Sequence, residues 1–160
     1  HQRAHAVNRA CVRHGKPLVS GAAIRFDGQL AVFDTRQPTS PCYHCLFPDG
    51  ENVEEVRCSQ MGVFAPLTGI IGTMQASEAL KLAGGFGSPS VGRLHLLDGR
   101  TLRFTDLRVP RDPDCPVAVT GLPHQRTASS RAIVSMHSVC RSFSRRSGEL
   151  TSSRSATVSP

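Results

Sequence analysis

The 160-residue sequence contains no tryptophan, and aromatic residues make up only 5% of it. We therefore expect a core built from leucine, valine, isoleucine and alanine with a few phenylalanines. No run of about 18 apolar residues occurs, which excludes a membrane-spanning helix. The amino-terminal HQRAHAVNRA lacks the continuous apolar stretch of a secretory signal, so we expect a cytoplasmic protein.

Cysteine is too sparse for a disulfide scaffold, with six residues in the chain. In a cytoplasmic protein such cysteines point first to metal binding or catalysis. A phosphate-binding loop is also missing. The segment PLTGIIGTMQ lacks the Lys-Ser or Lys-Thr of a P-loop, and Gly84-Gly85 follows a predicted helix where a phosphate site would precede one. The sequence therefore identifies no cofactor-binding residue.

The net charge of +7 is unevenly distributed along the chain. Residues 119–160 hold six arginines and one acid, Glu149, for a net +5, whereas residues 1–118 hold 13 basic and 11 acidic residues, for a net +2. The tail is rich in serine and has no helical or strand periodicity, so we predict one domain over 1–118 and a disordered tail over 119–160. The tail leaves weak binding of RNA or anionic lipid as an alternative function.

The first 118 residues predict an α/β fold with two helices and two hairpins. A hairpin over 17–33 has its turn near Asp27-Gly28, and a second over 93–109 turns at Asp98-Gly99. In the second hairpin, the alternation of Leu102 and Phe104 predicts one buried face.

A helix is expected over residues 4–14, with one face formed by Val7, Ala10, Cys11 and His14. A second helix, of about sixteen residues after Pro66, is expected to end at Gly84-Gly85. Small residues on one side of it, Gly69, Gly72 and Ala76, favour close packing of a neighbouring backbone.

Cys42 and Cys45 have the two-residue gap at which a chain can place two thiolates around one tetrahedral metal ion. Cys115 lies in a Cys-Pro-Val setting that looks like half of a matching knuckle, although residue 118 is alanine. Three thiols leave the fourth zinc position to His44, His124, Cys140, water or nothing. The alternative is that all three are reduced, partly buried thiols without a metal.

Cys58 stands apart in the polar segment EEVRCSQMG. A thiolate in such a loop can act as a nucleophile, and Arg57 would lower its pKa while Glu54 and Glu55 would raise it. Cys58 is therefore a candidate catalytic residue, with an incidental thiol as the alternative.

Five segments in this order resemble the C-terminal half of the ThiF/MoeB/HesA adenylyltransferases, which are relatives of ubiquitin-activating enzymes. They are PLVSGAAIRFDGQLAVFD, PCYHCLFP, RCSQMGVFAPLTGIIGTMQASEALKL, GRLHLLDGRTLRF and DPDCPV. The resemblance covers about residues 6–117. It implies the later part of a Rossmann-like domain with a mixed sheet whose parallel start precedes residue 1.

The resemblance implies an enzyme that uses MgATP to adenylate the C-terminal glycine of a ubiquitin-like sulfur-carrier protein in thiamine or molybdopterin synthesis. It implies that Cys42, Cys45 and Cys115 are similar to three ligands of a structural zinc. It also places Cys58 where a loop cysteine of ThiF-like members attacks the activated carrier. A homodimer is a further expectation from the family.

Two departures from the family pattern change what we expect of this chain. The residues that grip ATP in the family belong to a half that would precede residue 1, and CPVA replaces CPVC at Ala118 just before the tail. We therefore expect a fragment that is inactive alone, produced by a frame change after Val117. The alternatives to an enzyme are a carrier-binding remnant without catalysis and a basic-tailed nucleic-acid binder.

Overall fold

The computed structural model describes residues 2–49, 62–119 and 133–136. The helices are α1 (Gln2–Arg13), α2 (Tyr43–Leu46), α4 (Ala65–Gly84) and α5 (Pro116–Val119). The strands are β1 (Leu18–Ile24), β2 (Asp27–Phe33), β3 (Arg93–Asp98), β4 (Arg103–Arg108) and β5 (Ile133–Met136). None of the described helices combines the length and apolarity that crossing a bilayer requires.

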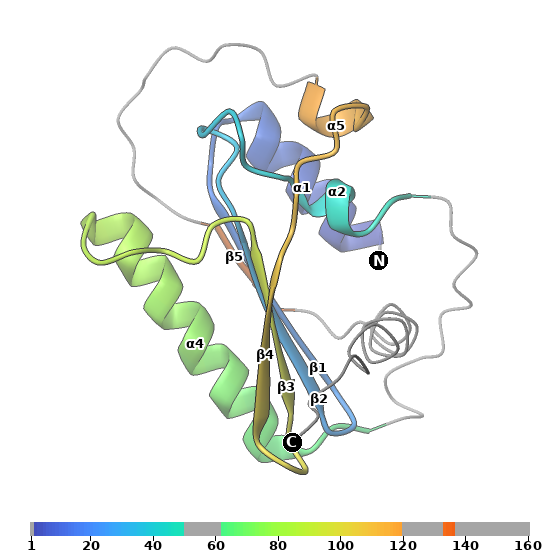
Figure 1. Ribbon diagram of the computed structural model, residues 1–160, viewed down its shortest axis with the longest axis vertical. Coiled ribbons are helices and arrows are strands. Elements are labelled where there is room, and N and C mark those ends of the chain that lie inside the picture. Colours follow the sequence, from blue (N-terminus) through green and yellow to red (C-terminus); the bar gives the residue numbers. More distant parts are fainter. Residues whose placement is uncertain (1, 50–61, 120–132, 137–160) are drawn as a thin grey trace, which may run out of the picture.

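The strands form one sheet in the order β4-β3-β2-β1-β5. Neighbours from β1 to β4 pair antiparallel, whereas β1 and β5 pair parallel, so the predicted α/β class with a mixed sheet is confirmed. The long helix α4 runs along one side of the sheet, while α1, α2 and α5 lie together at one end of it (Figure 1). The two long helices and two hairpins correspond to those expected from the sequence.

The first hairpin turns two residues earlier than the sequence predicted. Its turn is Arg25-Phe26, with Ile24 paired to Asp27 and a positive φ of 49° at Arg25. Gly28 lies inside β2, and a Cβ there would approach the Ile71 side chain to 2.8 Å. The glycine is therefore needed where α4 packs closely on the sheet, not for the turn.

The second hairpin turns where the sequence predicted. The Asp98 carboxylate accepts hydrogen bonds from the Arg100 backbone N–H at 2.9 Å and from the Thr101 hydroxyl at 3.0 Å. The predicted burial of Leu102 and Phe104 is wrong, because their exposed fractions are 64% and 58%. Strand β4 is the edge strand, whereas α4 packs on β1 and β2.

Helix α1 buries a different face from the one predicted. Val7 is only partly buried and His14 is exposed. The buried side chains are Ala4, His5, Asn8, Cys11 and Val12. Two of these side chains, His5 and Asn8, are polar, and a search for apolar spacing therefore predicted the wrong buried face of the helix.

The two sheet faces have separate cores. On the α4 side, one group of buried residues is Ala23, Leu67, Ile71 and Leu97, and a second is Val19, Leu30 and Val32. On the other side, α1 and α2 cover a larger core that includes Leu18, Ala31, Phe33, Tyr43, Leu94 and Leu96. The chain is thus a layered domain with a sheet between helices.

Strand β5 lies inside the segment 119–160 that the sequence predicts to be disordered. It pairs with residues 18–21 of β1, all of whose seven residues are buried. The outer backbone edge of β1 offers hydrogen-bond donors and acceptors to an extended segment, which explains how residues 133–136 form a strand in a stretch without strand periodicity. Residues 120–132 and 137–160 lie outside the described residues, so the domain boundary at 118 stays a prediction.

Close packing between α4 and the sheet depends on Gly21 in β1. Gln75 of α4 is 2% exposed and donates its Nε2–H to the Val19 carbonyl at 3.2 Å. A Cβ at Gly21 would overlap the Gln75 amide, whereas a Cβ at Gly69 or Gly72 would have no described atom within 4 Å. The predicted close approach at Gly69 and Gly72 is therefore wrong, and the small residues that matter belong to the sheet.

Gly21→Ala and Gly72→Ala form a matched pair of methyl additions. We expect Gly21→Ala to lower the free energy of unfolding by about 1–3 kcal/mol, because the Gln75 amide must move and lose its bond to Val19. Gly72→Ala should raise it by about 0.5–1 kcal/mol, because glycine inside a helix costs backbone entropy. Urea unfolding followed by circular dichroism measures both, and equal effects of the two substitutions would contradict this account of the packing.

Candidate metal centre

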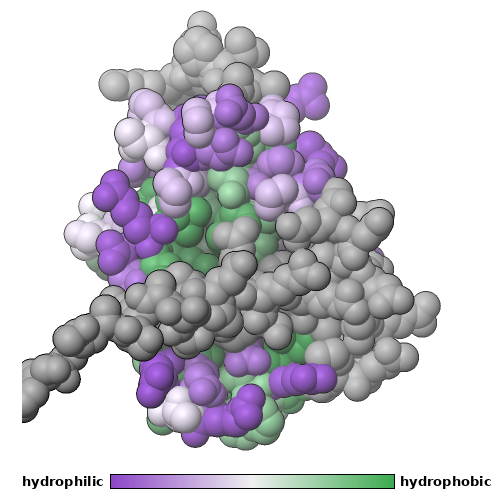
Figure 2. Space-filling view, turned by 45° about the vertical axis from the view of Figure 1, so that its right-hand side comes forward, coloured by the Kyte–Doolittle hydropathy of each residue, from purple (hydrophilic) through white to green (hydrophobic). Residues whose placement is uncertain are grey.

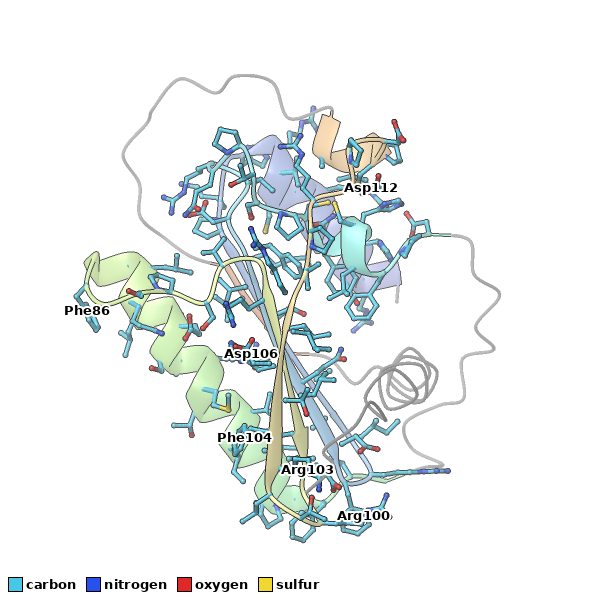
Figure 3. The ribbon with its side chains drawn as sticks, viewed as in Figure 1. Phe86, Arg100, Arg103, Phe104, Asp106 and Asp112 are labelled. Carbon is cyan, nitrogen blue, oxygen red and sulfur yellow. The ribbon has the colours of Figure 1, made fainter. Side chains whose placement is uncertain are left out.

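Three cysteine side chains meet where α1, α2 and α5 pack together. Cys42 caps the start of α2, Cys45 lies one turn later, and Cys115 directly precedes α5. The Cys42 sulfur lies 3.8 Å from that of Cys45 and 3.7 Å from that of Cys115. All three sulfurs lie within 4.8 Å of one another, so the predicted trio forms one cluster. Figure 3 shows sulfur atoms, in yellow, close to the labelled Asp112.

These distances fit a tetrahedral zinc site. A Zn–S bond of about 2.3 Å gives a distance of about 3.8 Å between two sulfurs of a tetrahedron. The measured distances at Cys42 match this value. A metal ion could therefore be bound without moving the backbone of α2 or of the segment before α5.

Each sulfur has a nitrogen atom within hydrogen-bonding distance. Asn8 Nδ2 lies 3.7 Å from the Cys42 sulfur, and the Cys42 backbone N–H donates to the Cys45 sulfur at 3.4 Å. His44 Nδ1 lies 3.4 Å from the Cys115 sulfur. Such donors stabilise thiolates, which are the form of cysteine that binds metals.

Without a metal, the surroundings of Cys42 do not favour its thiolate form. Burial raises the pKa of the Cys42 thiol to about 12. Hydrogen bonds from the Cys45 segment and Asn8 lower this pKa, whereas the nearby Cys45 and Cys115 thiols raise it further. Burial likewise raises the pKa of Cys11 to about 11. Cys11, however, packs in the main core, apart from the cluster. Among the residues that the structure describes, only the trio is arranged so that a cation could offset the cost of buried negative charge.

Ala118 is the neighbour that departs from a four-cysteine site. It is 7% exposed and packs with Val12, Cys42 and Cys115. Arg111 fixes this segment, because its guanidinium donates to the carbonyls of Ala118 and Pro38. The described residues thus supply three cysteine ligands for a tetrahedral site, with a methyl group beside them.

Of the residues considered for a fourth ligand, only His44 lies among the described residues. Its Nδ1 is next to Cys115, but the set of ligand atoms that lie within 4.8 Å of one another does not include it. His124 and Cys140 lie outside the described residues, and so does the candidate nucleophile Cys58. Their roles stay predictions.

Two site residues were missed by the sequence analysis. Asn8 links the helices, since it contacts the Cys42 sulfur and its Oδ1 accepts the Tyr43 N–H at 3.0 Å. Arg111 holds the α5 segment through backbone carbonyls. The only sequence signal for Asn8 was its position four residues after Ala4 and three before Cys11, which places all three on one face of a helix.

A pocket of about 550 Å³ adjoins the metal centre through Cys45. Its apolar lining comes from the end of α2, from β3 and β4, and from the residues after β4. It consists of Leu46, Phe47, Leu94, Leu96, Leu107, Val109, Pro110 and Pro113. Arg108, Arg111 and Asp112 add charge at this pocket. In Figure 2, hydrophobic residues, in green, gather in a hollow of the surface between hydrophilic residues.

Residues 1–117 match the ThiF family. The chain belongs to this family. It is 45% identical over 112 residues to the molybdopterin-synthase adenylyltransferase of Escherichia coli K12, covering 69% of this chain and 44% of the relative. It is also 45% identical over 119 residues to the sulfur carrier protein adenylyltransferase of Thermus thermophilus, covering 71% of this chain and 43% of that one. The ThiF-family segment thus spans less than half the length of these curated relatives.

Solved structures support the same fold. The chain superposes on Escherichia coli MccB in complex with MccA-N7isoASN with a TM-score of 0.60 at 17% identity, over 73% of this chain and 37% of MccB. MccB in complex with ATP gives a TM-score of 0.57 at 20% identity, over 71% and 35%. At this identity the likeness establishes the ThiF-type fold alone.

Ala118→Cys tests whether this ThiF-family chain holds metal through a three-thiolate cluster. The added thiol would enter the cluster beside Cys42 and Cys115, and a fourth thiolate should tighten zinc binding by about tenfold or more. Competition with a chromophoric zinc chelator under reducing conditions measures the change. Ala118→Ser is the control, because it adds a similar volume without a soft ligand, and equal affinities of the two variants would contradict the cluster geometry.

Proposed function

We propose that this chain takes part in adenylation of the C-terminal glycine of a ubiquitin-like sulfur-carrier protein. The observation that carries the proposal is the 45% identity to a molybdopterin-synthase adenylyltransferase and to a sulfur carrier protein adenylyltransferase. These relatives extend to more than twice the matched length, and we place MgATP binding in residues outside the matched segment. The described part would then recognise the carrier and not activate it by itself.

The pocket beside the metal centre is the proposed contact surface for the carrier. It combines eight apolar side chains with two arginines and one aspartate, which suits a flexible polypeptide segment with polar backbone and apolar side chains. Most of its lining comes from β3, β4 and the residues that follow β4, so the sheet fixes its shape. Such a preformed surface lowers the entropy cost of binding a partner.

Zinc is the proposed metal of the three-cysteine cluster. When bound, it would supply a structural link between the turn at α2 and the segment before α5, which are far apart in the sequence. The ligands would be Cys42, Cys45 and Cys115. Cytoplasmic location and a homodimer stay predictions from the sequence.

Leu107→Asp tests the carrier surface. Leu107 lines the pocket and is partly buried. A carboxylate there should weaken binding of a sulfur-carrier protein by about tenfold or more, because the carrier would displace its water without offering it a hydrogen-bond partner. Leu80→Asp on the exposed side of α4 is the matched control, because Leu80 is 63% exposed and does not line the pocket. Isothermal titration with the carrier measures both affinities.

Addition of ATP separates binding from catalysis in the same experiment. We expect the affinity for the carrier to be independent of ATP and no carrier-dependent exchange of pyrophosphate into ATP by this chain alone. Robust exchange would overturn the proposal that nucleotide binding uses residues outside the matched segment. Equal affinities of Leu107→Asp and Leu80→Asp would overturn the choice of surface.

Cys58→Ser tests the proposed nucleophile with a carrier that carries a C-terminal thioester. The Cys58 thiolate would attack the thioester carbonyl, form a carrier–Cys58 thioester and release the small thiol. We expect an adduct of chain and carrier, visible by mass spectrometry and cleaved by hydroxylamine, which Cys58→Ser abolishes. Cys11→Ser is the control, and an adduct that survives Cys58→Ser would remove Cys58 from the mechanism.

A further inference from the structure

His44 lies at the edge of the cysteine cluster and makes two polar contacts with opposite requirements. Its Nε2 is 3.3 Å from the backbone N–H of Asp49, so this nitrogen must accept. A neutral imidazole carries one proton, which therefore lies on Nδ1. The Nδ1–H faces the Cys115 sulfur at 3.4 Å and can donate to it.

The surroundings of His44 hold this arrangement in place. The Asp49 carboxylate contacts His5 Nδ1 at 3.2 Å and Arg9 at 3.4 Å, which ties the Asp49 segment to α1. The His5 ring packs edge-on against the His44 ring, with 6.0 Å between the centroids. His5 is 4% exposed and lies in the junction between α1 and α2, whereas Asp49 lies at the exposed edge of that junction.

The same contacts argue against His44 as a metal ligand. A ligating Nδ1 must offer its lone pair, which would move the proton to Nε2 and set it against the Asp49 N–H. The ligand atom of His44 also lies outside the mutual 4.8 Å set formed by the three sulfurs. The 3.4 Å distance to Cys115 is suited to a donor and a sulfur acceptor.

We propose that His44 is a positioning residue of the metal centre, which donates its Nδ1–H to the Cys115 thiolate and does not bind the metal. This inference rests on the proposed three-cysteine metal site. It completes a set in which Asn8, the Cys42 backbone and His44 each serve one sulfur. Three thiolates carry more negative charge than one divalent ion neutralises, and N–H donors lower the cost of burying the excess.

Two substitutions at His44 separate a donor from a ligand. In His44→Asn, the side-chain amide can place an N–H near the position of Nδ1 but is a poor zinc ligand, whereas His44→Leu removes the donor. We expect His44→Leu to weaken Co²⁺ and Zn²⁺ binding by about 10- to 100-fold, as loss of an outer hydrogen bond does, and His44→Asn to restore most of the affinity. His14→Leu, at an exposed histidine near the end of α1, should leave the affinity unchanged.

The measurement is titration of the reduced full-length chain with Co²⁺, followed by displacement with Zn²⁺. The visible bands of bound Co²⁺ report its ligands, and we expect the same band positions in the wild type, His44→Asn and His44→Leu. Urea unfolding of each metal-free variant shows whether it is folded.

The outcomes distinguish a donor role of His44 from a ligand role, and both from the absence of a metal centre. Equal losses in both His44 variants with shifted Co²⁺ bands would make His44 a ligand and overturn the inference. Unchanged affinity in both variants would also overturn it, because the hydrogen bond would then contribute nothing. If the wild type binds neither ion, the proposed metal centre itself fails and this inference fails with it, a result distinguished by the absence of Co²⁺ bands before any substitution.

Discussion

The contact between the Cys42 and Cys115 sulfurs is the constraint on which this end of the molecule depends. It joins side chains 73 positions apart in the sequence, one after the first hairpin and one after the second. Closing so long a loop is costly in chain entropy, and a bound divalent ion would offset that cost by an energy no pair of neutral thiols provides. Arg111 links the same two segments by donating to the carbonyls of Pro38 and Ala118, and Asn8 holds α2 against α1.

The rest of the fold gives this junction a rigid base. Helix α4 can lie close to the sheet because Gly21 and Gly28 leave room for Gln75 and Ile71. On the opposite face, α1 and α2 cover the sheet and carry Asn8, Cys42, His44 and Cys45, while Cys115 directly precedes α5. The pocket then forms where α2 meets β3 and β4, so metal centre and proposed carrier surface share Cys45 as a common wall.

Local sequence signals identified the elements better than their surroundings. Glycines at positions 15 and 85 terminate the two long helices, and Asp98 begins the turn of the second hairpin. These signals follow from backbone preferences that act within a few residues. The face buried by α1, the role of Gly28 and the exposure of Phe104 depend on which element packs beside them. These were mispredicted because neighbours distant in the sequence decide whether a residue is covered.

The sequence alone determined the family, the order of the two long helices and two hairpins, and the three cysteines that could bind a metal. Their types and spacing are local properties that persist in any conformation of the chain. Only the tertiary structure decided that the three sulfurs meet, that Asn8, the Cys42 backbone and His44 each serve one of them, and that Ala118 lies beside them. Distances and the donor or acceptor role of an imidazole nitrogen are set by which groups the folded chain brings into contact.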